Sequence, residues 1–179
     1  MKLDVDQKIL GAIPEELSNQ VLDLISPEHW YINETRNKMA NLEQTQSIIL
    51  RYFDDYKNAG KSDYLNYVED KEIYQVFKNP INKIKDELRK YYDFKNYLCF
   101  IAKLLPKQTV GMHIDRGSFL DQCHRVHIPI KTNSQVYYII ENSRYSWEKN
   151  KIYEFDNTRM HGVENNSDED RIHLLFNLY

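Results

Sequence analysis

The feature that most constrains the fold is a series of short apolar segments in the second half of the chain. Each segment is rich in β-branched or aromatic residues and is bounded by Gly, Asn, Asp or Ser, which is typical of strands joined by turns. The segments span residues 96–105, 109–115, 125–131, 134–140, 151–155, 161–165 and 171–179. Many short strands at this spacing predict a sandwich or a barrel.

The first half of the chain has a different pattern. Apolar residues recur at helical spacing in 14–25 and in 70–93, whereas 47–53 ("SIILRYF") is typical of a strand. Pro80 is expected to break the second helix or to start a new one, because proline lacks the N–H that a helix interior needs.

Length and composition indicate how these elements combine. The chain has 179 residues, of which 41% are hydrophobic and 28% are charged, and these values are typical of one globular domain. Segregated helices and strands favour an α+β, mainly β fold. We therefore expect a single domain in which residues 1–95 give mixed helical support to a β-core in 96–179.

Charge and cysteine content exclude several classes of partner. The net charge of −3 does not provide the basic surplus that sequence-independent nucleic-acid binding requires. Cys99 and Cys123 form no CxxC or zinc-ligand spacing and are expected to be reduced thiols. The first residues are too acidic for a signal peptide, and no apolar run reaches the roughly 20 residues that span a bilayer. These observations predict a cytoplasmic protein without a nucleic-acid or membrane partner.

Three polar residues in the predicted strands suggest a metal site. His113 and Asp115 are two positions apart, so on a strand their side chains share a face. His161, at the start of another predicted strand, supplies a third ligand. Two histidines and one carboxylate with open positions are typical of non-haem Fe(II) oxygenases. The alternatives are an ordinary polar turn for the first pair and a hydrogen-bonded loop histidine for His161.

Arg171 begins the last predicted strand, ten residues after His161. An arginine directed into a barrel is costly unless it is paired. A dicarboxylate such as 2-oxoglutarate is a suitable partner, because a guanidinium binds a carboxylate through two parallel hydrogen bonds. The alternative is an edge-strand arginine paired with Asp168 or Asp170.

These motifs resemble those of a known family. The ordered set of HxD, a later His and an Arg about ten residues beyond resembles the signature of Fe(II)/2-oxoglutarate dioxygenases. Within that group, "HRVHIPI", then Trp147, then "IYEFDNTRMHGVENNSDEDRIHLLFN" resemble the aspartyl/asparaginyl β-hydroxylase family over roughly 104–177. The resemblance implies a double-stranded β-helix, or jelly roll, with iron at its open end. It also assigns Arg125 and His127 to the 2-oxoglutarate pocket together with Arg171.

The resemblance leaves the substrate open. Some animal members lack the iron-binding carboxylate, carry a membrane anchor and helical repeats, and act on extracellular-type domains. This sequence has Asp115 and none of that apparatus. Other, bacterial-type members resemble hydroxylases of free amino acids such as proline. The expected activity is therefore hydroxylation, with Fe(II), 2-oxoglutarate and O₂, of an amino acid or of an Asp, Asn or Pro side chain in a peptide or protein.

Two further residues are candidates for binding this substrate. Arg116 is suited to a substrate carboxylate, and His124 either lines the mouth of the site or packs outside the barrel. Two alternative functions remain. One is a non-enzymatic, cupin-like protein that binds a metal or a small acid. The other is oxidative demethylation of a nucleobase, against which the acidic balance argues.

Overall fold

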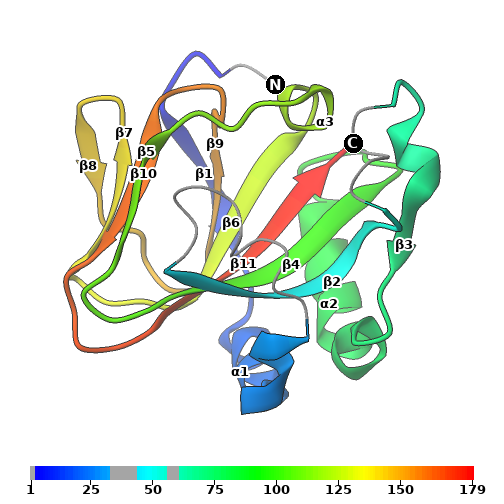
Figure 1. Cartoon of the computed structure of the whole chain (residues 1–179), viewed down its shortest axis with the longest axis horizontal. Helices are drawn as coiled ribbons and strands as arrows, with labels where there is room; N and C mark the ends of the chain where they lie inside the picture. Colours follow the sequence, from blue (N-terminus) through cyan, green and yellow to red (C-terminus); the bar gives the residue numbers. More distant parts are fainter. Residues whose placement is uncertain (1–2, 33–43, 56–60) are drawn as a thin grey trace.

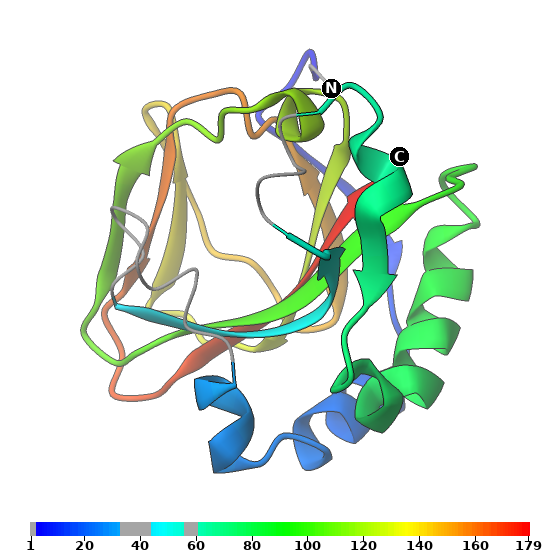
Figure 2. The same ribbon diagram turned by 45° about the vertical axis from the view of Figure 1, so that its right-hand side comes forward.

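Two antiparallel β-sheets face each other in the computed structural model, which describes residues 3–32, 44–55 and 61–179 (Figure 1). The larger sheet has seven strands within these ranges, in the order β1-β9-β6-β11-β4-β2-β3, and the smaller has four, in the order β5-β10-β7-β8. The arrangement is the jelly roll that the family resemblance implies, with helices packed on the outside of the larger sheet (Figure 2).

The strand bounds follow the predicted segments closely. The larger sheet consists of β1 (Gln7–Ala12), β2 (Thr45–Phe53), β3 (Val68–Asp70), β4 (Tyr97–Leu104), β6 (His124–Lys131), β9 (Lys151–Phe155) and β11 (Arg171–Leu178). The smaller sheet consists of β5 (Thr109–His113), β7 (Val136–Ile140), β8 (Ser143–Tyr145) and β10 (His161–Asn165). The remaining elements are α1 (Glu15–Asp23), α2 (Tyr74–Leu88), α3 (Ser118–Asp121) and the 3-10 helices η1 (Pro27–Tyr31) and η4 (Tyr64–Tyr67).

The two faces of the larger sheet have different chemistry. On the outer face, the main apolar core joins alternate residues of β6 and β11, such as Val126 and Leu174, to Phe77 and Ile81 of α2. Burying each such side chain stabilises the fold by about 2 kcal/mol. The intervening residues of β6 and β11 point inward, because successive side chains on a strand alternate between faces. Several of these inward residues are polar and buried: Arg125, His127, Arg171, His173 and Asn177.

The N-terminal part of the chain supplies strands as well as helices. The strand expected at 47–53 is present as β2, and β1 and β3 join the same sheet although the sequence pattern did not predict them. β1 pairs with β9, and β2 pairs with β4. Residues before 96 therefore extend the sheet that carries the inward polar side chains.

The expected break at Pro80 is wrong. Pro80 lies inside α2, which runs without interruption from Tyr74 to Leu88. Phe77 precedes the proline and Ile84 follows it, and both are fully buried against the sheet. Packing on both sides of the proline thus outweighs the lost backbone hydrogen bond. None of the helices in the described ranges is both long and apolar enough to cross a membrane.

Candidate active site

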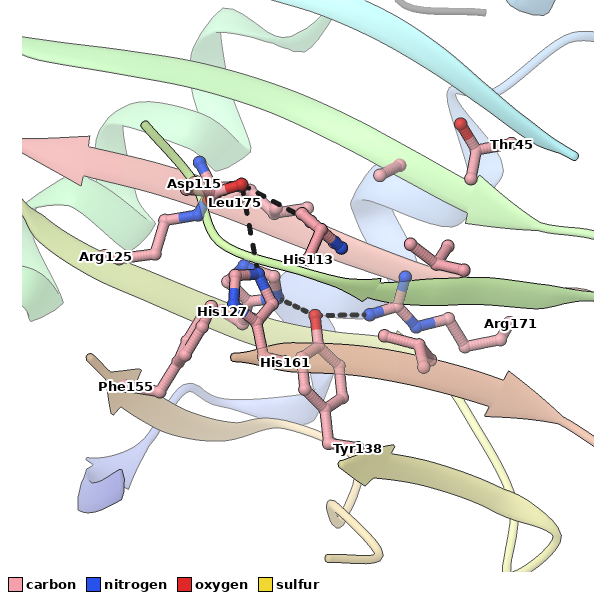
Figure 3. Close-up of a pocket in the computed structure, with 13 residues that line it drawn as sticks. Thr45, His113, Asp115, Arg125, His127, Tyr138, Phe155, His161, Arg171 and Leu175 are labelled. Atoms are coloured by element: carbon pink, nitrogen blue, oxygen red, sulfur yellow. Dashed lines mark hydrogen bonds and ion pairs between the residues drawn. The ribbon is translucent and has the colours of Figure 1, made fainter. Parts of the chain in front are cut away.

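A cavity lies between the two sheets and contains most of the polar residues singled out from the sequence. About 530 Å³ of empty space lies in and at the mouth of this cavity, and part of it is open solvent. Its polar lining is shown in Figure 3 and consists of Thr45, His113, Asp115, Arg125, His127, Tyr138, His161 and Arg171. Apolar side chains such as Phe155 and Leu175 complete the wall.

The three predicted metal ligands converge at one side of this cavity. His113 is the last residue of β5 and lies opposite His161, the first residue of β10. Asp115 follows the end of β5, and its backbone N–H donates a hydrogen bond of 3.1 Å to the carbonyl oxygen of Asn157. One ligand atom from each of the three side chains lies within 4.8 Å of the others.

Backbone contacts orient both imidazoles toward the carboxylate. Nδ1 of His113 lies 2.8 Å from the carbonyl oxygen of Gly111, and Nδ1 of His161 lies 2.9 Å from that of Arg159. A carbonyl only accepts hydrogen bonds, so each Nδ1 donates and each neutral ring keeps its lone pair on Nε2. These Nε2 atoms lie 3.4 Å and 3.9 Å from Oδ1 of Asp115. Two lone pairs and a carboxylate directed at one point suit a divalent cation.

The local charges keep Asp115 ionised. Burial alone would raise its pKa, but the contact with His113 and the positive charge of Arg125 outweigh burial and lower the pKa of Asp115. The same contact with Asp115 raises the pKa of His113. Burial lowers the pKa of His161. The carboxylate is therefore available as an anionic ligand at neutral pH.

Gly162 allows β5 and β10 to approach closely at the ligand pair. A Cβ at this position would lie 2.9 Å from the carbonyl oxygen of Val110 and 3.0 Å from Sδ of Met112. The pairing of β5 with β10 also shifts register between His161 and Val163. A side chain at 162 would push β5 away and separate the two histidines.

Arg171 points into the opposite end of the cavity. It is 5% exposed, and its Nη2 donates to the hydroxyl oxygen of Tyr138 at 3.0 Å and to Nδ1 of His173 at 2.8 Å. The alternative pairing with Asp168 or Asp170 is wrong, because these carboxylates lie near lysines at 3.0 Å (Lys107) and 3.9 Å (Lys103). Within the described residues, no carboxylate lies within ion-pair distance of Arg171, and its Nε has no partner.

Arg125 lies close to the metal-ligand cluster. Its Nη1 donates to Oδ1 of Asn177 at 2.7 Å, and its Nη2 lies 3.7 Å from Oδ2 of Asp115. The guanidinium carbon sits 5.4 Å from the ring centroid of Phe100, while Nε has no partner among the described residues. The cavity therefore has one guanidinium beside the ligand cluster and another at the far end.

The comparisons with known proteins agree with this geometry. The sequence model described as "Aspartyl/Asparaginyl beta-hydroxylase" matches residues 64–179, which is more than half of the chain. The chain belongs to the aspartyl/asparaginyl β-hydroxylase family. The match begins at Tyr64, well before the residues on which the sequence resemblance rested. A comparison with curated protein sequences finds no match.

Solved structures share the fold at low sequence identity. A 2OG-Fe(II) oxygenase family oxidoreductase from Burkholderia pseudomallei has a TM-score of 0.66 at 14% identity, covering 98% of this chain and 84% of that chain. A prolyl hydroxylase from Trichoplax adhaerens, in complex with a hypoxia inducible factor peptide fragment, has a TM-score of 0.61 at 13% identity, with coverages of 97% and 83%. A Pseudomonas putida prolyl-4-hydroxylase has a TM-score of 0.56 at 11% identity, with coverages of 98% and 92%.

Sequence reasoning missed Thr45 and Tyr138 of the polar lining, and also Asn177, which accepts a hydrogen bond from the lining residue Arg125. Tyr138 is one of fourteen tyrosines, and no motif marks it. Asn177 shares the inward face of β11 with Arg171, so strand alternation over the whole strand would have found it.

Two residues of the family motif have structural contacts. The Trp147 ring stacks between Tyr138 and Tyr153, with centroid distances of 3.7 Å and 4.6 Å, and so packs against Tyr138 of the cavity lining. The Asn165 amide donates to the carbonyl oxygens of Leu104, Leu105 and Glu169 and accepts from Ser167, which ties adjacent turns together. Loop structure therefore explains this motif.

The structure does not bring the two candidate substrate residues into the cavity lining. Arg116 is exposed. His124 lies on the outer face of β6, where its Nδ1 is 2.6 Å from Oε1 of Glu154 and its ring is 4.1 Å from the Tyr92 ring. For His124 the interpretation that agrees with the structure is packing outside the barrel, because its neighbour Arg125 occupies the inward position.

Proposed function

We propose that this protein is an Fe(II)- and 2-oxoglutarate-dependent hydroxylase that acts on an amino acid, or on an Asp, Asn or Pro side chain of a peptide or protein. The observation that carries the proposal is the metal-ligand cluster of His113, Asp115 and His161 in the same cavity as the buried guanidinium of Arg171. Family membership supports the reaction type. Fold similarity to the Burkholderia, Trichoplax and Pseudomonas enzymes supports the assignment of cofactors.

The residues of the cluster suit iron. His113 and His161 each direct Nε2 toward the carboxylate of Asp115, and the three donors would leave other coordination positions open. Bound Fe(II), with 2-oxoglutarate and O₂, would supply the oxidising chemistry that inserts one oxygen atom into a C–H bond. The protein would hold the metal ligands in place within the cavity between the two sheets.

The far end of the cavity suits the distal carboxylate of 2-oxoglutarate. Arg171 is buried there, and its Nε has no partner in the described residues; Nε2 of His127, which Tyr138 links to Arg171, has none either. Buried donors without acceptors are costly, and a carboxylate would satisfy them. Arg125, close to Asp115, would assist at the metal end of the co-substrate.

We also propose that the chain functions as a single domain. β1 and β2 from the N-terminal part pair with β9 and β4 from the C-terminal part, so both parts build one sheet. The cavity itself contains Thr45 from β2. A separate N-terminal domain would not contribute to the lining in this way.

The test is consumption of 2-oxoglutarate with Fe(II), combined with mass spectrometry of a substrate panel. The panel contains free amino acids and peptides with Asp, Asn or Pro, and the expected product gains one oxygen atom. Asp115→Ala and His113→Ala should abolish turnover, while Asp168→Asn, on an exposed turn, should retain it.

Two results would contradict the proposal. Turnover that survives Asp115→Ala would remove the metal assignment. Tight metal or acid binding without 2-oxoglutarate consumption for any panel member would favour the non-enzymatic, cupin-like alternative.

A further inference from the structure

A buried hydrogen-bond network connects the two sheets along the wall of the cavity. Nη2 of Arg171 (β11) donates to the hydroxyl oxygen of Tyr138 (β7) and to Nδ1 of His173 (β11). The same hydroxyl lies 2.6 Å from Nδ1 of His127 on β6. Figure 3 shows the part of this chain that runs from Arg171 through Tyr138 to His127. All four side chains are buried.

The direction of each hydrogen bond follows from the chemistry of arginine. A guanidinium carries only donors, so the oxygen of Tyr138 and Nδ1 of His173 must accept from it. The Tyr138 hydroxyl then has one hydrogen left. Nδ1 of His127 is the acceptor within reach in the described part of the chain. A buried hydroxyl that donates to nothing costs free energy, so the hydrogen of Tyr138 points to His127.

This direction determines which nitrogen of His127 carries its hydrogen. Burial, with the nearby charge of Arg125, holds the pKa of His127 well below its usual value, so the ring is neutral. A neutral imidazole that accepts at Nδ1 has its single hydrogen on Nε2. Nε2 of His127 has no partner in the described residues, and His127 lines the cavity.

We propose that Tyr138 is a positioning residue that fixes the tautomer of His127, so that Nε2–H becomes a hydrogen-bond donor for an anion in the cavity. Tyr138 holds the guanidinium of Arg171 with the same oxygen. The pocket then presents hydrogen-bond donors from one cation and one neutral ring, which suits a ligand whose ends only accept, such as a small dicarboxylate. The identity of that ligand rests on the proposed function, whereas the tautomer is a property of the protein alone.

The first test is nitrogen NMR of the protein labelled with ¹⁵N-histidine, without metal. We expect the resonances of His127 to show hydrogen on Nε2 and none on Nδ1, with the His127→Gln variant identifying the signal. In Tyr138→Phe, Nδ1 loses its donor, and we expect a mixture of the two tautomers. The control is Tyr137→Phe, because Tyr137 precedes it on β7, faces the other way and contacts Arg144. Circular dichroism verifies that each variant is folded.

The second test measures the affinity for 2-oxoglutarate by calorimetry. Losing a hydrogen bond to a charged group should weaken binding about tenfold in Tyr138→Phe, and Tyr137→Phe should match the wild type. A glutamine amide can replace an Nε2 donor, whereas an asparagine amide occupies the place of Nδ1. We therefore expect His127→Gln to retain more affinity than His127→Asn.

The outcomes separate this inference from the proposed function. A wild-type His127 with hydrogen on Nδ1, or a tautomer unchanged in Tyr138→Phe, overturns the inference whatever the protein binds. A wild-type protein with the expected tautomer but no affinity for 2-oxoglutarate contradicts the proposed function and leaves the role of Tyr138 supported.

Discussion

Replacing Arg171 by methionine should make the protein more stable and unable to bind its co-substrate. Arg171 is a buried cation without a carboxylate partner in the described residues, and burial lowers the pKa of its guanidinium. Methionine fills a similar apolar volume and carries no charge. Arg171 is thus expected to lower the stability of the free protein and to stabilise the protein only when an anion is bound.

The size of the effect follows from two opposing contributions. Removing a buried, uncompensated charge is worth several kcal/mol. The substitution also deprives Nδ1 of His173 of its donor and Tyr138 of one partner, which costs about 1–3 kcal/mol. The net gain is about 2 kcal/mol, equivalent to a rise in Tm of about 4–8 °C for a chain of this length.

Differential scanning fluorimetry with and without 2-oxoglutarate measures both effects. Arg171→Met should melt at a higher temperature than the wild type, and only the wild type should be stabilised further by the ligand. Arg144→Met, on the surface, is the control and should change the free energy of unfolding by no more than about 0.5 kcal/mol. If Arg171→Met melts at a lower temperature, the guanidinium stabilises the free fold and the reasoning is refuted.

Three other predictions concern the same cavity. Gly162→Ala should push β5 from β10 and weaken divalent-metal binding, measured by Co(II) titration, about tenfold or more; unchanged affinity would show that the strands need not approach so closely. Asn177→Leu should leave the protein folded but weaken 2-oxoglutarate binding about tenfold, because Arg125 loses the hydrogen-bond acceptor that lies 2.7 Å from its Nη1. Unchanged affinity in calorimetry would show that Asn177 does not position Arg125 for binding. The free energy of unfolding, measured by urea titration, should fall as the pH is lowered below about 6.5. The reason is that His127 and His173 become protonated in the unfolded chain, whereas burial lowers their pKa values in the folded state. A free energy of unfolding that does not change with pH, or a pH dependence that is the same in His173→Gln, would contradict this prediction.

Local sequence patterns predicted much of the β-core. The segments 151–155 and 161–165 coincide with β9 and β10, because turn residues mark both ends of each strand. β1 was missed because it becomes a strand by pairing with β9, far along the chain. The break expected at Pro80 failed because packing against the sheet holds α2 together on both sides.

The candidate site was likewise predicted only in part from local sequence patterns. Spacing and resemblance singled out His113, Asp115, His161 and Arg171, and the structure brings all four to one cavity. The contacts of Tyr138 depend on how the two sheets face each other, and no local pattern contains that information. His124 shows the converse, since proximity in sequence to Arg125 did not place it in the cavity.

The position of β5 at the outer edge of the smaller sheet has a consequence for assembly of the site. His113 ends this strand, and its neighbour across the ladder is His161 on the interior strand β10. A cation bound by both histidines would cross-link the edge strand β5 to β10 next to the point where the pairing of the two strands shifts register. Amide hydrogen exchange along β5 should then slow when a divalent metal is added. The exchange rate of β5 would therefore report whether the metal site is occupied, even before any substrate is known.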